Sequence, residues 1–131
     1  MLMMKRLFLI ILFLLLPSSV FADWKIDVKS VYDGDTITAD INLGLGIVLV
    51  DQKIRLLYID APEIKGLFKN KGNKSKEYLM SLLKNQEVYL SLDPKEKERD
   101  SFGRILGILK IEDVIINDKM VEDGYAIPYK K

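Results

Sequence analysis

Carboxylate side chains that could bind a metal ion or activate water occur at two places in this sequence. Asp33 and Asp35 flank a glycine, and Asp60 and Glu63 flank an Ala-Pro pair. Asp35 and Asp60 are hard oxygen ligands of the kind that Ca²⁺ and Mg²⁺ prefer, and a backbone carbonyl at the Ala-Pro corner could complete the set. The Asp-Gly-Asp sequence is not an EF-hand loop, because the glycine and the distal glutamate of that motif stand elsewhere. Taken singly, each pair could be only a polar turn.

Two arginines accompany these carboxylates. Arg55 lies inside the apolar run Lys53–Ile59, and Arg104 follows Asp100-Ser101-Phe102-Gly103. A planar guanidinium can hold two phosphate oxygens and stabilise the charge that grows in a five-coordinate transition state. Arg55 and Asp60 are five positions apart, so a straight strand would point them to opposite faces. We expect the Asp-Ala-Pro-Glu corner to supply the bend that brings them together.

The chain contains neither cysteine nor histidine. It therefore has no thiolate nucleophile, no sulfur-ligated zinc, no disulfide and no imidazole general base. Glu63 then remains as the carboxylate that could orient or deprotonate a water molecule. A cation held by Asp35 and Asp60 would neutralise a phosphate oxygen. Together with Arg55 and Arg104, these groups predict phosphodiester hydrolysis.

The elements that must position these groups are mostly strands. Alternating or β-branched runs predict strands over 24–31, 36–41, 47–50, 53–60, 87–92 and 105–111, with a turn at Asp51-Gln52. We expect a helix over 74–84 and a short one over 117–123, capped by Asn117 and stopped by Gly124. The lysine-rich stretch 65–73 is predicted to be a solvated loop that could also meet phosphates, and 93–100 another loop. This order is typical of a mainly β, five-stranded Greek-key barrel whose first helix lies between strands three and four.

The N-terminal residues have the pattern of a signal peptide. Lys5 and Arg6 precede the apolar run Leu7–Leu16, and Val20-Phe21-Ala22 has small residues at a cleavage site. The run is too short to span a bilayer, and no cysteine is present for a lipid anchor. We therefore expect a signal peptide at 1–22, one domain at 23–131, and a secreted or periplasmic monomer without stable membrane association. Loss of two basic residues from 20 leaves 18 against 19 acidic ones, a net charge of −1, so nucleic-acid affinity must come from a local patch.

Three motifs in this order resemble the staphylococcal (thermonuclease-like) nucleases, and they are 31–36 (VYDGDT), 54–63 (IRLLYIDAPE) and 100–104 (DSFGR). The resemblance implies an OB-fold barrel and a Ca²⁺-dependent nuclease. Such an enzyme would act on DNA and RNA, single-stranded or melted, with little sequence preference. It would cut the bond to the 5′ oxygen and leave 3′-phosphate ends.

The resemblance also assigns roles position by position. Arg55, Glu63 and Arg104 match the catalytic residues of the family. Asp35 and Asp60 match its calcium ligands, and Ala61 matches a ligand that acts through its backbone carbonyl. Asp33 would hold these ligands in position without binding the ion itself.

The sequence also departs from the family pattern. Ala61 replaces a common threonine, Phe102 replaces a frequent tyrosine, and the loop before Lys53 is somewhat longer. The chain ends at Lys131, so we do not expect the last helix of the better-known members. Tyr125 and Tyr129 would then have to supply the aromatic wall of the base pocket.

Two other functions fit parts of this pattern. A non-catalytic OB-type module could bind single-stranded nucleic acid or a protein partner through the barrel alone. Such a module would not need Arg55, Glu63 and Arg104 together, and all three are present. A calcium-binding structural protein would account for the carboxylates and leave the two arginines unexplained.

Overall fold

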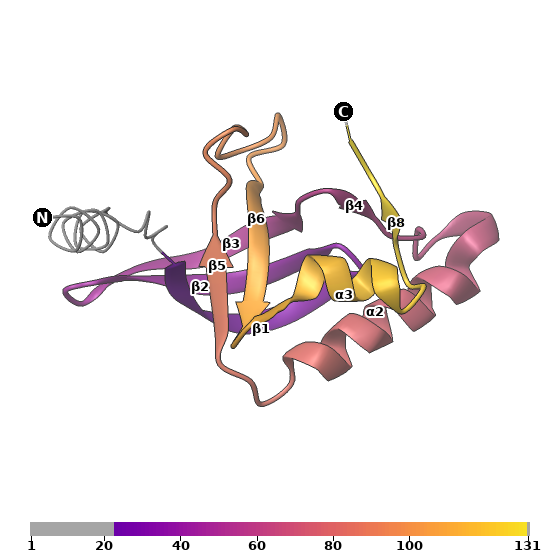
Figure 1. Ribbon diagram of the computed structural model, residues 1–131, viewed down its shortest axis with the longest axis horizontal. Coiled ribbons are helices and arrows are strands. Elements are labelled where there is room, and N and C mark those ends of the chain that lie inside the picture. The colour runs from indigo at the N-terminus through magenta and orange to yellow at the C-terminus, as the bar shows by residue number, and fades with distance from the viewer. Residues whose placement is uncertain (1–22, 131) are drawn as a thin grey trace, which may run out of the picture.

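The computed structural model describes residues 23–130, so the expected signal peptide at 1–22 lies outside the described residues. The elements in chain order are β1 (Asp23–Asp33), β2 (Thr36–Gly44), β3 (Ile47–Leu56), β4 (Ile59–Asp60), η1 (Gly66–Phe68), α2 (Lys69–Leu83), β5 (Val88–Ser91), β6 (Ile105–Ile111), β7 (Val114–Ile115), α3 (Ile116–Glu122) and β8 (Ile127–Pro128). Figure 1 shows the strands crossing the molecule, with both helices packed against one side.

The long strands close into a barrel. Strands β1, β2 and β3 form an antiparallel meander, and β1 also pairs with β5 on its other edge. Strand β5 is antiparallel to β6, and β6 runs parallel to the end of β3, which closes the ring in the order β1-β2-β3-β6-β5. The predicted five-stranded OB-fold barrel is confirmed, and α2 lies between the third and fourth barrel strands as expected.

One apolar core fills the barrel and the space beneath the helices. Alternating strand residues such as Ile37, Ile54 and Leu109 are fully buried, and α2 and α3 add Leu79 and Met120. Each such side chain contributes roughly 1.5–3 kcal/mol to folding through removal of its surface from water. All residues of the core cluster lie between positions 26 and 126. Residues 23–130 therefore contain the whole barrel and its packing helices.

Strand β3 is longer than predicted. The sequence favoured a turn at Asp51-Gln52, but the strand continues through both residues. Asp51 takes a left-handed conformation, with φ of 53°, and its N–H donates to Asp40 Oδ1 at 2.8 Å. The register of β3 against β2 shifts at this point. A bulge thus absorbs the turn-forming residues without ending the strand.

Helix α2 begins at Lys69, within the stretch predicted to be a loop. The lysines of this stretch have good helix propensity. Gly72 does not break the helix, and it is needed because the helix packs closely against the backbone of Glu63 at this position. A Cβ on Gly72 would lie 2.1 Å from the Glu63 carbonyl oxygen, so only glycine allows this close approach. No helix within residues 23–130 is long and apolar enough to cross a membrane.

Asn117 does not cap α3, in contrast to the prediction. The N-cap position is Ile115, and Asn117 lies buried in the first turn. Its Oδ1 accepts the Leu109 N–H at 3.0 Å, and its Nδ2 donates to the Leu57 and Gly107 carbonyls at 2.9 and 3.1 Å. The side chain thus ties α3 to β6 and to the turn after β3. Buried backbone groups that need partners explain its position better than a cap does.

Candidate active site

Asp35 lies in the tight turn between β1 and β2. Asp33 Oδ1 accepts the Asp35 N–H at 3.0 Å, which fixes the turn. A Cβ on Gly34 would lie 1.9 Å from Ser75 Oγ and 2.7 Å from the Ala61 Cβ. The turn therefore packs directly against α2 and the segment after β4, and this contact sets the position of Asp35.

The carboxylate of Asp35 is buried and accepts one hydrogen bond on each oxygen. Its Oδ1 accepts from Thr36 Oγ1 at 3.1 Å, and its Oδ2 accepts the Ala61 N–H at 2.8 Å. Burial, aided by Asp33, raises the pKa of Asp35 to about 6, although the Ala61 N–H and Arg55 act in the opposite direction. Since burial disfavours its ionised form, this carboxylate would gain from a neighbouring cation.

Arg55 lies between the two predicted metal-binding carboxylates. It stands near the end of β3, opposite Thr36 on β2. Its Nη1 donates to the carbonyls of Leu56 and Ile59, at 2.8 and 3.0 Å. Its Nη2 lies 3.4 Å from Asp35 Oδ2 and 3.5 Å from Asp60 Oδ1. The carbonyl bonds hold the guanidinium in place while Nη2 faces both carboxylates.

The bend that brings Arg55 and Asp60 together occurs earlier than predicted. Strand β3 ends at Leu56, and the chain turns at Leu57 and Tyr58, the latter with φ of 67°. Leu57 N–H donates to the Gly107 carbonyl at 2.9 Å, so β6 holds the turn. The expected meeting of the two side chains is confirmed, whereas its placement at the Asp-Ala-Pro-Glu corner was wrong.

The C-terminal segment supports this bend from outside. Strand β8 pairs with β4, which places Ile127 opposite Asp60. Tyr129 N–H donates to the Tyr58 carbonyl at 2.7 Å, and the Tyr58 hydroxyl donates to Asp93. This pairing could not be predicted from sequence patterns, because two-residue strands carry no periodicity. Asp60 is therefore held by a strand partner from the far end of the chain, while its side chain stays half exposed.

Glu63 presents its side chain to solvent near the start of α2. The contact of Gly72 with the Glu63 carbonyl fixes its backbone. Within residues 23–130 its carboxylate takes part in no ion pair or hydrogen bond. Its backbone is thus fixed, whereas no contact within the described residues fixes its carboxylate or joins it to Asp35, Arg55 or Asp60.

Arg104 is held by Asp100 across a tight turn. Asp100 Oδ2 accepts Arg104 Nε at 2.7 Å, and Asp100 Oδ1 accepts the N–H groups of Phe102 and Arg104 at 3.0 and 2.9 Å. The Arg104 Cζ lies 5.4 Å from the centre of the exposed Phe102 ring. Because Ile54 pairs with Ile105, Arg104 stands at the same end of the barrel as Arg55. Asp100 belongs to the third sequence motif, but its positioning role emerges only from this geometry.

Of the two tyrosines expected to form an aromatic wall, only Tyr129 has a largely free ring. Tyr125 stacks on Tyr78, with ring centres 4.1 Å apart and planes inclined by 17°. This stack joins α2 to the segment after α3. Tyr125 therefore contributes to packing in this structure.

The donor set suits a hard cation such as Ca²⁺. Asp35 Oδ2 and Asp60 Oδ1 both lie within 3.5 Å of one nitrogen and are therefore no more than about 7 Å apart. The carbonyl of Ala61, whose N–H binds Asp35 Oδ2, is the third oxygen that the family resemblance predicts, and water completes most such sites. Among residues 23–130 no group of three Asp, Glu, His or Cys side chains converges. Asp35 and Asp60 are thus two carboxylates that could share one cation, and Arg55 lies close to both.

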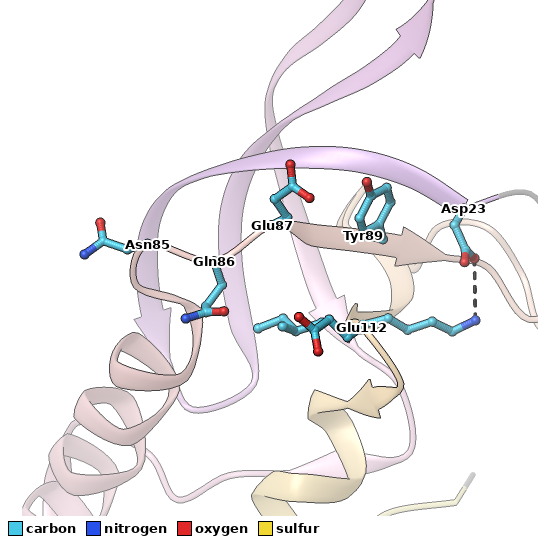
Figure 2. Close-up of a pocket in the computed structure, with 8 residues that line it drawn as sticks. Asp23, Asn85, Gln86, Glu87, Tyr89 and Glu112 are labelled. Atoms are coloured by element: carbon cyan, nitrogen blue, oxygen red, sulfur yellow. Dashed lines mark ion pairs between the residues drawn. The ribbon is translucent and has the colours of Figure 1, made fainter.

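The described clefts lie away from this constellation. One has a volume of about 360 Å³, and its lining includes Glu87, Glu112 and the ion pair of Lys110 Nζ with Asp23 Oδ1, 3.5 Å apart. Figure 2 shows this cleft. A second, of about 600 Å³, lies between β1 and the end of α2. Neither is lined by Asp35, Arg55 or Arg104. These two clefts therefore do not coincide with the candidate site, which lies where the end of β3 pairs with β6.

The sequence pattern described as staphylococcal nuclease homologue matches residues 53–131. The chain belongs to the staphylococcal nuclease family. The match includes Arg55, Asp60, Ala61, Glu63 and Arg104 and begins after Asp35. The resemblance drawn from the three motifs is thereby confirmed.

Three of the proteins similar to this chain are named as nucleases. A micrococcal nuclease of Shigella flexneri is 32% identical over 129 residues, covering 89% of this chain and 65% of that protein. An uncharacterized endonuclease of Haemophilus influenzae is 35% identical over 104 residues, covering 79% and 52%. A thermonuclease of Staphylococcus intermedius is 32% identical over 106 residues, covering 76% and 56%. The chain spans between about half and two thirds of the length of these relatives.

Proposed function

We propose that this protein is an exported, Ca²⁺-dependent nuclease that hydrolyses phosphodiester bonds of DNA and RNA with little sequence specificity and leaves 3′-phosphate ends. The observation that carries the proposal is the position of Arg55 between Asp35 and Asp60, within 3.5 Å of both. Family membership and the names of the relatives support nuclease activity. An apolar run preceded by two basic residues supports export, to a periplasm or the medium.

Three oxygen donors of the chain are assigned to the metal ion. Asp35 and Asp60 would bind it through their carboxylates and Ala61 through its carbonyl. When bound, the ion would neutralise charge on a phosphate oxygen and help to order the attacking water. Asp33 acts indirectly, because it fixes the turn that carries Asp35.

The two arginines are assigned to the phosphate. Arg55 keeps its Nη1 on the carbonyls of Leu56 and Ile59, so Nη2 is the group that would turn to a phosphate oxygen. Arg104 uses Nε on Asp100 and leaves its Nη groups for the substrate. Preorganised donors of this kind stabilise charge that develops in the transition state.

Glu63 is assigned as the general base. It would accept a proton from the water that attacks phosphorus, and the bond from phosphorus to the 5′ oxygen would then break. Its exposed carboxylate and fixed backbone suit this role. In a chain without histidine, no imidazole can replace it.

A basic segment beside the site favours a polyanionic substrate. Five lysines and no acidic residue stand between Glu63 and Glu77, and they are Lys65, Lys69, Lys71, Lys74 and Lys76. Most of them lie on α2, whose Gly72 contacts Glu63. Phosphate contacts by lysine supply affinity without reading base sequence, which agrees with low specificity. Single-stranded or melted substrate would fit the open barrel end.

The direct test compares cleavage of heat-denatured DNA by the purified protein in millimolar Ca²⁺ and in excess chelator. We expect cleavage only with Ca²⁺, and loss of Ca²⁺ affinity in Asp60→Asn but not in the exposed control Asp27→Asn, measured by calorimetry. Binding of DNA without cleavage, by a protein whose circular dichroism shows it folded, would instead indicate the non-catalytic OB module.

A further inference from the structure

The hairpin formed by β2 and β3 carries an unusual concentration of exposed apolar side chains. It projects beyond the barrel on the left of Figure 1. Its exposed apolar residues are Leu43 (42%), Leu45 (101%), Ile47 (55%), Val48 (47%), Leu49 (37%) and Val50 (58%). No charged residue occurs from Ile41 to Val50. Single exposed leucines are normal on protein surfaces, but a contiguous apolar patch marks an interaction site.

Leu45 at the tip is the least expected residue of this hairpin. It is fully exposed and has a left-handed backbone with φ of 56°, between Gly44 and Gly46. Asparagine or glycine would adopt this conformation at lower cost. Folding therefore gives no reason for a leucine at this position. A role for the side chain outside the folded chain explains it.

Both faces of the ribbon are apolar. Successive strand residues point to opposite faces, so Ile47 and Leu49 lie on one face, and Val48 and Val50 lie on the other. A protein partner would cover one face. Pairing of the free β3 edge with a second copy would widen the ribbon and leave both faces exposed. Lipid is the partner that surrounds a ribbon on both sides.

Charged residues form a collar at the base of the ribbon. Lys29 Nζ lies 3.2 Å from both Asp40 Oδ2 and Asp51 Oδ1. These two acids flank the uncharged segment 41–50 in the sequence. An apolar tip followed by a charged base is typical of a segment whose tip lies in the membrane interface while its base stays in water.

The ribbon is suited to the surface of a bilayer and not to its centre. Strand β6 pairs only with residues 54–56 of β3, so the outer backbone groups of 47–51 have no strand partner among residues 23–130. Open sheet edges are not tolerated in the hydrocarbon core, but headgroups and water can satisfy them. Insertion to about 5–10 Å, at the boundary of headgroups and acyl chains, meets both requirements.

The start of the described chain lies on the same side as the hairpin. Strand β1 begins there at Asp23 (Figure 1). Residues 1–22 precede Asp23 and, as a signal peptide, would be removed on export. The hairpin alone therefore has to account for contact of the mature domain with a membrane.

We propose that the hairpin 41–50 is a membrane-interface anchor that inserts its tip among the lipids of a bilayer. This proposal differs from the expectation that the domain lacks stable membrane association, which stays a prediction. Asp35 stands at the other end of β2, about 25 Å away at the usual rise per residue. An anchored protein would thus present its candidate active site to the aqueous phase, where a polynucleotide is found.

The absence of cysteine allows a single-site test in the full chain. Leu45→Cys is labelled with an environment-sensitive fluorophore, and Leu67→Cys, at a leucine that is 99% exposed before α2 on the far side, is the control. With vesicles of phosphatidylcholine, alone or mixed with phosphatidylglycerol, we expect a blue shift and quenching by acyl-brominated lipid only at position 45. Equal responses at both positions, or none, would overturn the proposal. A shift without vesicles that grows with protein concentration would point to a second copy instead.

Binding of the protein to vesicles tests the membrane anchor in a chain that lacks the apolar run Leu7–Leu16. The chain from Asp23 contains the whole core cluster, and circular dichroism verifies its folding. Leu45→Asn, which suits the left-handed backbone, and Val48→Asn should each lower binding to both kinds of vesicle about tenfold, with little effect of salt. Leu67→Asn should bind like the parent. Cleavage of DNA in vesicle-free solution should be unchanged in the two hairpin variants, so failure of the anchor and failure of the nuclease proposal remain distinguishable.

Discussion

The guanidinium of Arg55 and the carboxylate of Asp60 lie 3.5 Å apart, although their spacing in a straight strand would place them on opposite faces. The turn at Tyr58 interrupts the strand, so the Asp60 side chain points to the same side as that of Arg55. Arg55 reaches the site from β3 and keeps its own anchor on two backbone carbonyls. This arrangement leads to a first prediction about Arg55.

Arg55→Lys should reduce kcat for denatured DNA by at least about 100-fold, because an ammonium cannot keep two carbonyl bonds and also reach a phosphate oxygen. Calcium affinity should change much less, since the positive charge beside Asp35 and Asp60 is retained. Rates and calorimetry on the same preparations measure both effects. The control is Arg99→Lys, at an exposed arginine that bonds the Gly103 carbonyl and Gln52. Similar losses in both variants would show that Arg55 is merely structural.

Asp100→Asn should destabilise the protein by about 2 kcal/mol at neutral pH, because a nearly buried carboxylate loses its charge-assisted bonds to Arg104. Although burial raises the pKa of Asp100, the Arg104 N–H and side chain hold it below its ordinary value of 3.8. The carboxylate therefore stabilises the fold above pH 3.8, and this advantage is lost as pH falls through the lower folded pKa. Urea unfolding across pH, with exposed Asp113→Asn as control, measures the difference. An advantage that grows on acidification would contradict this account.

Gly72→Ala should destabilise the protein by at least about 1 kcal/mol, although alanine is the better helix former. The added Cβ would fall 2.1 Å from the Glu63 carbonyl oxygen and push α2 away from it. Turnover should fall with stability, because Glu63 would move. Thermal melts and single-turnover rates check both, with Asn73→Ala on the same helix as control. A gain in stability would show that the contact between Gly72 and Glu63 is loose.

Asn117→Ala should lower the free energy of unfolding by about 3 kcal/mol. The change leaves the Leu109 N–H and the Leu57 and Gly107 carbonyls buried without their amide partner. Because Leu57 begins the turn that carries Asp60, calcium affinity should also fall. Denaturant unfolding and calorimetry measure the two effects. Retention of full stability would mean that water replaces the amide.

Sequence patterns were sufficient for the barrel, because its strands alternate or carry β-branched residues at regular intervals. They failed where a tertiary contact decided the outcome. Asp51 has turn chemistry but sits in a bulge, and the stretch around Gly72 looks like a loop but is helical because the glycine meets Glu63. Asn117 is a residue type that often caps helices, but its side chain instead forms hydrogen bonds with the Leu109 N–H and with the carbonyls of Leu57 and Gly107. Local propensity cannot foresee partners that are distant in sequence.

The sequence predicted which residues form the candidate site, but it did not predict the contacts that hold those residues in position. Arg55 lies within 3.5 Å of both Asp35 and Asp60, and the Ala61 N–H binds Asp35, whereas the roles of Asp35, Asp60 and Ala61 as metal ligands stay predictions. The position of the bend, the β8 strand beside Asp60 and the anchoring of Arg104 by Asp100 were not foreseen, because each depends on backbone groups that carry no sequence signal. The roles of Arg55, Glu63 and Arg104 in catalysis remain predictions that kinetics must decide.

The most direct test of the active site is the single-turnover rate of Ca²⁺-dependent cleavage of denatured DNA by Glu63→Gln. The control is Glu112→Gln, which removes an exposed carboxylate in the remote cleft of Figure 2. Loss of the general base should slow cleavage by about 100-fold or more at saturating Ca²⁺, while Ca²⁺ affinity and folding stay unchanged and the control cleaves at the parent rate. A rate for Glu63→Gln equal to that of the parent would contradict the assignment of the base and with it the proposed active site.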